Sequence, residues 1–151
     1  MAVGHVRDAS NDKRDRVSAQ PLSMRYVKGP LVIAHNGALS NFSKVREELE
    51  EGGAIFQTTT DAEMIAYTIA RQRLNTGTIE QAVELAMDKL EGAYSLIIMT
   101  PGKLVGARDP QGFRPLALGK CGNSYMLASE SCAFDSIGGE FIRDVEPGEI
   151  I

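Results

Sequence analysis

Asn36 and Gly37 place two hydrogen-bond donors side by side, a side-chain amide and the backbone N–H of a residue without a side chain. Such a pair suits an anion or an oxyanion. Asn-Gly also makes tight hairpin turns, because both residues tolerate positive φ, but a hairpin needs a second strand after it. Instead, Phe42, Val45 and Leu49 follow at helical spacing. The sequence therefore predicts a buried strand that runs through His-Asn-Gly toward a helix.

Two further polar clusters could bind charge. "GHVR" ends in Arg7, and "QTTTDAE" contains Asp61 at the start of a helical pattern. A guanidinium pairs with a carboxylate through two parallel hydrogen bonds, and an aspartate at a helix start commonly caps it. Taken singly, Arg7 would be a surface cation and Asp61 an N-cap. Their occurrence together with the Asn36–Gly37 pair favours a binding site.

The usual nucleophile and metal motifs are missing from the sequence, which has no G-x-S-x-G, H-E-x-x-H or G-x-G-x-x-G. A histidine triad or metal site would have to use His5 or His35, and we expect both to be structural. Cys121 and Cys132 are separated by ten residues, which matches no zinc spacing and gives no disulfide framework.

Composition places the chain among soluble single-domain proteins. It has 151 residues, of which 43% are hydrophobic and 24% charged. The net charge is −4, the isoelectric point is near 5.2, and no basic run exceeds two residues, so we expect no nucleic-acid partner. We expect no membrane partner either, since no apolar stretch approaches spanning length and the start lacks a signal-peptide core. The predicted location is the cytoplasm.

The chain order of the predicted elements places helices first. The patterns predict an exposed loop over residues 8–18, a buried strand at 30–35, a helix from Phe42 ended by Gly52-Gly53, a short strand closed by Ile55 and Phe56, a helix that Asp61 caps, and a helix whose capping box joins Thr78 to Gln81.

Beyond Gly92 the pattern becomes a meander of strands. These are predicted at residues 93–100, 103–107, 115–119, 124–129 and 140–145, with a short helix within 130–138. Helices packed on a largely antiparallel sheet make an α+β fold of one domain. The final "VEPGEII" is still rich in strand formers, so we expect the chain to continue in a longer protein.

Several stretches together resemble the glutaminase domain of the amidophosphoribosyltransferase family. They are "GHVR", "AHNG", "FQTTTDAE", "GAYSL", "GARDPQGFRPLALG", "LASESCAFD" and "FIRDVEPGEI", which cover nearly the whole chain. The first two are shared with all class II glutamine amidotransferases, whereas the Arg-Asp-Pro and Val-Glu-Pro-Gly stretches are narrower. The resemblance implies an N-terminal nucleophile hydrolase fold, an αββα sandwich of two antiparallel sheets between helical layers.

The resemblance also implies roles for the polar residues. In this family an amino-terminal Cys attacks the glutamine carboxamide, with its own α-amine as base. The Asn36 side-chain amide and the Gly37 N–H would hold the oxyanion. Arg7 would pair with the glutamine α-carboxylate, and Asp61 with the α-ammonium. Released ammonia would pass to a phosphoribosyltransferase domain and displace pyrophosphate from phosphoribosylpyrophosphate, giving phosphoribosylamine in the first committed step of purine biosynthesis.

The chain departs from the family pattern at its start, because Gly4 is almost its first residue and the nucleophile and its strands are absent. Residues 8–10, Asp-Ala-Ser, replace the usual Tyr-Ser-Thr. The phosphoribosyltransferase half is also absent. We therefore expect residues 1–151 to be a partial glutaminase domain, truncated at its N-terminus, inactive alone and self-associating as a homo-oligomer. The alternative is a stand-alone, non-catalytic module that binds an amino acid or a partner.

No cofactor is expected in this chain. For the larger enzyme the resemblance allows Mg²⁺ and, in the iron–sulfur branch of the family, a [4Fe–4S] cluster. A Cys at the position of Cys132 supplies one cluster ligand in that branch, and three others come from the phosphoribosyltransferase half.

Overall fold

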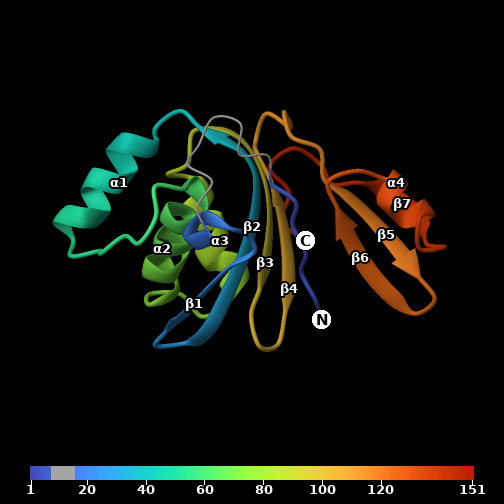
Figure 1. Ribbon diagram of the computed structural model, residues 1–151, viewed down its shortest axis with the longest axis horizontal. Coiled ribbons are helices and arrows are strands. Elements are labelled where there is room, and N and C mark those ends of the chain that lie inside the picture. Colours follow the sequence, from blue (N-terminus) through green and yellow to red (C-terminus); the bar gives the residue numbers. More distant parts are fainter. Residues whose placement is uncertain (8–15) are drawn as a thin grey trace.

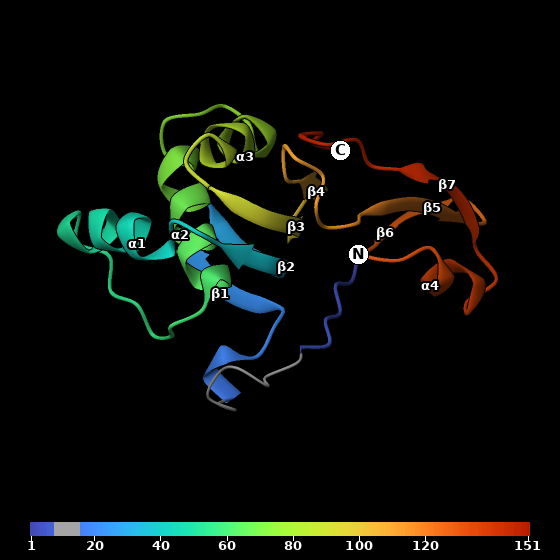
Figure 2. The ribbon, with the colours of Figure 1, turned by 90° about the horizontal axis from the view of Figure 1, so that it is seen from above.

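A computed structural model describes residues 1–7 and 16–151. Its helices and strands form successive layers (Figures 1 and 2). Two helices, α2 (Asp61–Arg73) and α3 (Ile79–Met87), lie on one face of a first sheet, and α1 (Phe42–Glu51) packs beside α2. A second sheet lies beyond the other face, and α4 (Cys132–Asp135) packs on its outside. This arrangement confirms the predicted α+β fold with two sheets between helical layers.

Both sheets are antiparallel throughout. The first contains β1 (Leu22–Tyr26), β2 (Gly29–Leu39), β3 (Gly92–Met99) and β4 (Leu104–Arg108), in that spatial order. The second has the order β6-β5-β7, formed by Ser124–Ala128, Ala117–Cys121 and Glu140–Asp144. The central strand β2 is the longest, with 11 residues, so it extends past the end of β1.

The main core lies between the first sheet and the helices. Its fully buried side chains include Leu31, Ile33, Leu96 and Ile98 from the strands and Met64, Ile65, Ile69 and Val83 from the helices. Burying each side chain of this size stabilises the fold by about 1.5–3 kcal/mol. The α3 capping box between Thr78 and Gln81 is present as predicted.

The opposite face of the first sheet carries smaller side chains. Strand residues alternate between faces, so Ala34 and Asn36 stand beside their partners Ile97 and Ser95 on the face away from the helices. Gly106 allows the second sheet to approach, because a Cβ atom there would lie 2.7 Å from the Leu127 side chain. Ala34, Asn36, Ser95 and Ile97 line the space that remains between the two sheets.

Three local predictions differ from the structure. Ile55 and Phe56 form no strand, and Ile55 is 74% exposed, with its carbonyl accepting a hydrogen bond from the Tyr67 hydroxyl at 2.8 Å. Thr60 is the N-cap of α2, so Asp61 is its first helical residue rather than its cap. β1 was not predicted from the sequence, although Leu22, Met24 and Tyr26 alternate with the exposed Ser23 and Arg25 as in a half-buried strand.

The predicted loop over residues 8–18 can be compared only in part. Residues 8–15, including the Asp-Ala-Ser that departs from the family pattern, lie outside the described residues, and Arg16–Ser18 forms a short 3-10 helix. In the described part of the chain, no helix combines the length and the apolar character that crossing a bilayer requires.

Candidate functional site

A cavity of about 770 Å³ lies between the two sheets and is lined by the predicted site residues. Arg7 lies in the N-terminal segment, Asn36 and Gly37 in β2, and Asp61 at the first turn of α2. Leu116, Leu127 and Ala128 close it from the second sheet and the segment before it. The fold thus brings the four predicted site residues, from three separate parts of the sequence, to one cavity.

Gly37 has a backbone conformation that other residues rarely adopt. Its φ is +148°, and a Cβ atom would lie 1.9 Å from the carbonyl oxygen of Ala93. Both the dihedral angle and the contact exclude a side chain here. β2 can therefore continue without interruption past Gly37 only because this residue is glycine.

The N–H of Gly37 points away from β3. Successive residues of an antiparallel strand bond alternately to opposite neighbours. Ser40 donates its N–H to the carbonyl of Glu91, which stands opposite it, so these two residues form a hydrogen-bonded pair. Gly37 lies an odd number of residues from Ser40, so Gly37 and its partner Tyr94 form a pair without hydrogen bonds between β2 and β3. Its partner Tyr94 accordingly turns its carbonyl to the other side, where it accepts the Asp109 N–H at 2.9 Å. The Gly37 N–H is thus available at the outer edge of β2.

Asp61 joins the start of α2 to this edge. Its Oδ2 accepts the Leu39 N–H at 2.9 Å, and its position in the first turn suits the positive end of the helix dipole. Arg7 donates from Nη1 to the Ser18 carbonyl at 3.4 Å. Both charged side chains are therefore held by backbone groups beside the cavity that they line.

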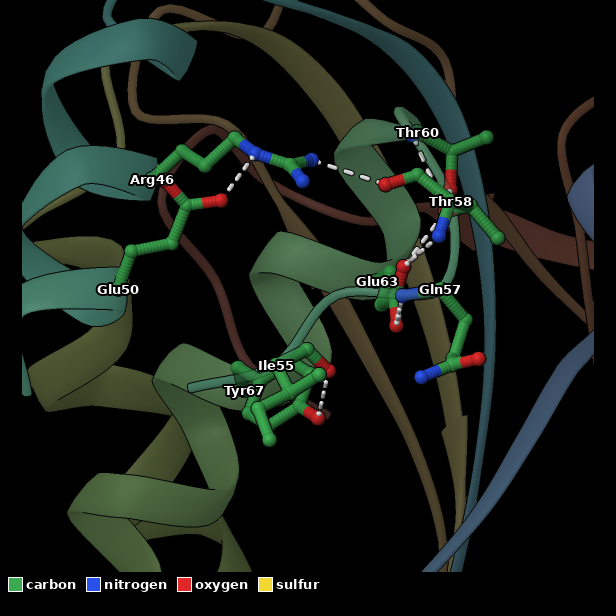
Figure 3. Close-up of polar contacts among 8 residues, drawn as sticks. All are labelled: Arg46, Glu50, Ile55, Gln57, Thr58, Thr60, Glu63 and Tyr67. Atoms are coloured by element: carbon green, nitrogen blue, oxygen red, sulfur yellow. Dashed lines mark hydrogen bonds and ion pairs between the residues drawn. The ribbon is translucent and has the colours of Figure 1, made fainter. Parts of the chain in front are cut away.

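The "QTTTDAE" segment is organised by Glu63, a residue to which the sequence analysis gave no role (Figure 3). This buried carboxylate accepts the N–H groups of Gln57 and Thr58 at 2.8 and 2.6 Å and the Thr58 hydroxyl at 2.7 Å. The Thr58 hydroxyl also contacts that of Thr60 at 2.8 Å. Glu63 thereby fixes the loop that leads into Asp61.

Arg46 ties α1 to the same loop. Its Nη1 donates to the Thr58 carbonyl at 2.8 Å, and its Nε pairs with Glu50 at 2.9 Å (Figure 3). Its guanidinium also lies 4.2 Å from the centre of the Phe56 ring. A cation over an aromatic face adds to the stability of such a contact. The helix predicted after Gly37 therefore supports the cavity wall from behind.

His35, which we expected to be structural, also lines the cavity. The residue is 6% exposed, and its Nε2 has no hydrogen-bond partner among the described residues. Burial, with smaller contributions from His5 and Arg114, lowers the pKa of His35 from 6.5 to about 4. His35 is therefore neutral at physiological pH.

Arg114 is a cavity residue that the sequence analysis did not single out. Two neighbours from the "GARDPQGFRP" stretch fix its backbone: the buried Asp109 carboxylate accepts its N–H at 3.0 Å, and Arg108 Nε donates to its carbonyl at 2.8 Å. Asp109 also accepts the N–H groups of Gln111 and Phe113. Arg114 lies in the "GARDPQGFRPLALG" stretch, which resembles the family, so the sequence did contain a signal for this residue.

Gln20 and Ser95 are two further cavity residues that sequence reasoning missed. Gln20 accepts the His35 N–H through Oε1 at 2.6 Å, and Ser95 stands opposite Asn36 in the β2–β3 register. Ser95 lies in the "GAYSL" stretch, which was noted for its resemblance, whereas Gln20 lies in none of those stretches, and its contact depends on the register of the first sheet.

The cysteines lie outside the cavity. Cys121 and Cys132 are absent from its lining, and the Cys132 thiol is exposed, 3.6 Å from a Glu130 carboxylate oxygen. Within residues 1–7 and 16–151, no three His, Cys, Asp or Glu side chains gather where they could hold a metal ion. Cys132 by itself could supply one of the four thiolates that a [4Fe–4S] cluster requires.

Comparison with known proteins identifies the family. A glutamine amidotransferase domain model matches residues 6–136. The amidophosphoribosyltransferase of Bacillus subtilis is 41% identical over 151 residues, which cover 99% of this chain and 31% of the relative. That of Archaeoglobus fulgidus is 40% identical over 147 residues, covering 97% of this chain and 32% of the relative. The chain thus spans about a third of these relatives' length.

Solved structures agree with the sequence comparison. The structure described as the allosteric regulatory enzyme of purine biosynthesis superposes with a TM-score of 0.89 at 41% identity, covering 97% of this chain and 31% of that one. Glutamine phosphoribosylpyrophosphate amidotransferase from B. subtilis, complexed with ADP and GMP, gives a TM-score of 0.86 at 40% identity over the same shares. These neighbours confirm the N-terminal nucleophile hydrolase type of fold. The chain therefore belongs to the glutamine amidotransferase family, and the relatives it matches are amidophosphoribosyltransferases.

Proposed function

We propose that this chain forms the glutamine-binding part of an amidophosphoribosyltransferase. The observation that carries the proposal is the convergence of Arg7, Asn36, Gly37 and Asp61 on one cavity between the sheets. These are the residues to which the family resemblance gives roles in glutamine recognition and oxyanion stabilisation. They come from distant parts of the sequence, so their convergence depends on the fold.

The chemistry of each residue suits its proposed role. The planar guanidinium of Arg7 would pair with the α-carboxylate of glutamine, and the Asp61 carboxylate with its α-ammonium. The Asn36 amide and the Gly37 N–H would then stabilise the negative charge that develops on the amide oxygen. Each donor of this kind is typically worth a hundred- to a thousandfold in rate, roughly 3–4 kcal/mol.

The nucleophile is the one function that the described residues do not supply at the cavity. Neither cysteine lines it, and an internal cysteine has no α-amine to act as base. In the proposed enzyme an amino-terminal Cys outside residues 1–151 would attack the carboxamide. Ammonia released there would react with phosphoribosylpyrophosphate in a further domain, giving phosphoribosylamine. We place this homo-oligomeric enzyme in the cytoplasm, with Cys132 as a cluster ligand in an iron–sulfur form.

A second function, amino-acid binding without hydrolysis, is favoured by the same absence of a thiol from the cavity of the described residues. Both functions require selective recognition of the charged end of glutamine. They differ only in whether turnover appears when the chain is joined to a segment that begins with the amino-terminal Cys of the family.

Binding of L-glutamine tests the recognition step. Two charge-assisted hydrogen bonds of about 1.5–3 kcal/mol each support a dissociation constant on the order of millimolar. Titration followed by NMR should show saturable shifts with L-glutamine but not with butyramide, which lacks both α-groups. Arg7→Ala and Asp61→Asn should abolish these shifts, whereas Arg25→Ala, at an exposed position of β1, should not. Equal binding of glutamine and butyramide would contradict the proposal.

A further inference from the structure

The backbone N–H groups of His35, Gly37 and Leu39 all point outward from the same edge of β2. They share this edge because alternate residues of a strand bond to opposite neighbours. The N–H of Ile33, two residues before His35, points to β1, where Ile33 pairs with Leu22, the first residue of that strand. Beyond Ile33, β1 supplies no further partner for this edge.

Side chains replace the strand at two of the three positions. Oε1 of Gln20 accepts the His35 N–H at 2.6 Å, and Oδ2 of Asp61 accepts the Leu39 N–H at 2.9 Å. Gln20 also stands at the next register position, because Leu22 is opposite Ile33 and each step moves two residues along both strands. Its side-chain oxygen thus does what a strand carbonyl would do.

Gly37 lies between these two bonded positions. The next register position along would be Ser18, but Ser18 belongs to the 3-10 helix Arg16–Ser18, and its carbonyl accepts a hydrogen bond from Arg7. Residues 1–7 and 16–151 therefore provide no strand partner for the Gly37 N–H. Gln20, Gly37 and Asp61 all line the cavity, so this N–H is presented there between two fixed neighbours.

We propose that Gln20 is a positioning residue for the Gly37 N–H. Only Asn36 separates the anchored His35 N–H from Gly37, so the hydrogen bond to Gln20 limits rotation of the backbone that carries both oxyanion donors. Asp61 limits it from the other side. Gln20 touches neither the reacting atoms nor the substrate in this scheme, and it acts through β2. The inference rests on the proposed function, in which the Gly37 N–H binds an oxyanion.

Amide hydrogen exchange and NMR shifts of the ¹⁵N-labelled chain test this positioning directly. Gln20→Ala should raise the exchange rate at His35 at least tenfold and move the Gly37 amide resonance, while Gln20→Glu, which keeps an acceptor oxygen, should restore both. Gln111→Ala changes an exposed glutamine away from the cavity and should leave both unchanged. An unchanged Gly37 resonance or an unchanged His35 rate in Gln20→Ala would overturn the proposal.

Titration with L-glutamate separates this proposal from the function on which it rests. A γ-carboxylate oxygen of L-glutamate carries charge near the place where the oxyanion would form. The Gly37 amide should shift saturably in the wild-type chain, and the shift should fall at least threefold in Gln20→Ala. If the wild-type chain binds no L-glutamate, the proposed function is contradicted, and the exchange experiment still decides the role of Gln20.

Discussion

Gly37 lies so close to Ala93 that a Cβ atom on it would come within 1.9 Å of the Ala93 carbonyl oxygen. The contact joins β2 to β3 at the point where the cavity meets the sheet. Because this contact is with backbone rather than with a flexible side chain, it cannot be relieved by a rotamer change. The absence of a side chain at this position is therefore a requirement of the fold as well as of the site.

Gly37→Ala should be severely destabilising. The substitution adds both the strain of a φ of +148° and the backbone clash, so we expect the free energy of unfolding to fall by more than about 4 kcal/mol. Urea unfolding followed by circular dichroism measures this. Gly102→Ala is the matched control, since a Cβ there meets nothing within 4 Å, and its effect should stay within about 0.5 kcal/mol. Similar midpoints for the two variants would refute the argument.

Glu63→Ala should loosen the loop that precedes α2. The substitution leaves the N–H groups of Gln57 and Thr58 without an acceptor and removes the carboxylate partner of the Thr58 hydroxyl, so we expect a loss of about 3 kcal/mol in unfolding free energy. Exchange at the Thr58 N–H should also accelerate. Glu47→Ala, at an exposed position of α1, should change stability by less than about 0.5 kcal/mol. A stable Glu63→Ala variant with slow exchange at Thr58 would show that the carboxylate does not hold the loop.

His35 should make the protein less stable as the pH falls. The pKa of His35 is about 4 in the folded chain and 6.5 in the unfolded chain, so only the unfolded state takes up its proton between these values. This contribution is complete above pH 6.5 and is lost on acidification toward pH 4, by about 3 kcal/mol. Unfolding free energies at pH 7 and pH 4.5 should therefore differ less in His35→Gln than in the wild type.

His5→Gln provides the control for this pH dependence. Partial burial and Arg7 also lower the pKa of His5, but His5 is less buried than His35, so its variant should keep most of the wild-type difference between the two pH values. An imidazole titration by NMR with a His35 pKa near 6.5 would remove the basis of the prediction.

The 151-residue chain should not hydrolyse glutamine. Asn36 and Gly37 stabilise an oxyanion only after a nucleophile has attacked, and no thiol lines the cavity of the described residues. Incubation with glutamine should yield no glutamate or ammonia above the background of a heat-denatured sample. Turnover that survives replacement of both Cys121 and Cys132 by Ser, and is lost in Asn36→Ala, would mean that another nucleophile occupies the site.

The chain should self-associate, because the second sheet ends in exposed apolar residues. Tyr125 on the outer strand β6 is 68% exposed, and Phe141 and Ile142 on β7 are also exposed. Unpaired strand edges of this kind pair readily. Sedimentation at tens of micromolar should show a dimer that Tyr125→Lys weakens and Val27→Lys, in the β1–β2 turn, does not. A wild-type monomer at that concentration would contradict the prediction.

Local sequence patterns predicted most elements because their signals are short-range. The capping box of Thr78 and Gln81 and the apolar repeat after it identify α3 without tertiary information. Ile55 and Phe56 were wrongly assigned to a strand, because their apolar character does not show that Ile55 stays exposed. β1 was missed although its five residues alternate between apolar and polar, because a pattern this short is recognised as a strand most readily through its pairing with β2.

The candidate site was predictable only where a motif contained the residue. Arg7, Asn36, Gly37 and Asp61 lie in stretches that resemble the family, and all four line the cavity. Their roles remain predictions. The contribution of Gln20 depends on where β1 begins relative to β2, and a strand register of this kind cannot be read from one sequence.

The placement of the cavity between the sheets also bears on the order of folding. Its walls come from residues as far apart in the chain as Gly4 and Ser129, so no contiguous segment contains a binding surface. Contacts between such distant residues form late, because closing long loops costs conformational entropy that local helices avoid. A ligand that fits this cavity would recognise only molecules in which both sheets have docked. Its binding would therefore protect the whole fold from proteolysis, and ligand-induced protection could be used to count correctly assembled molecules.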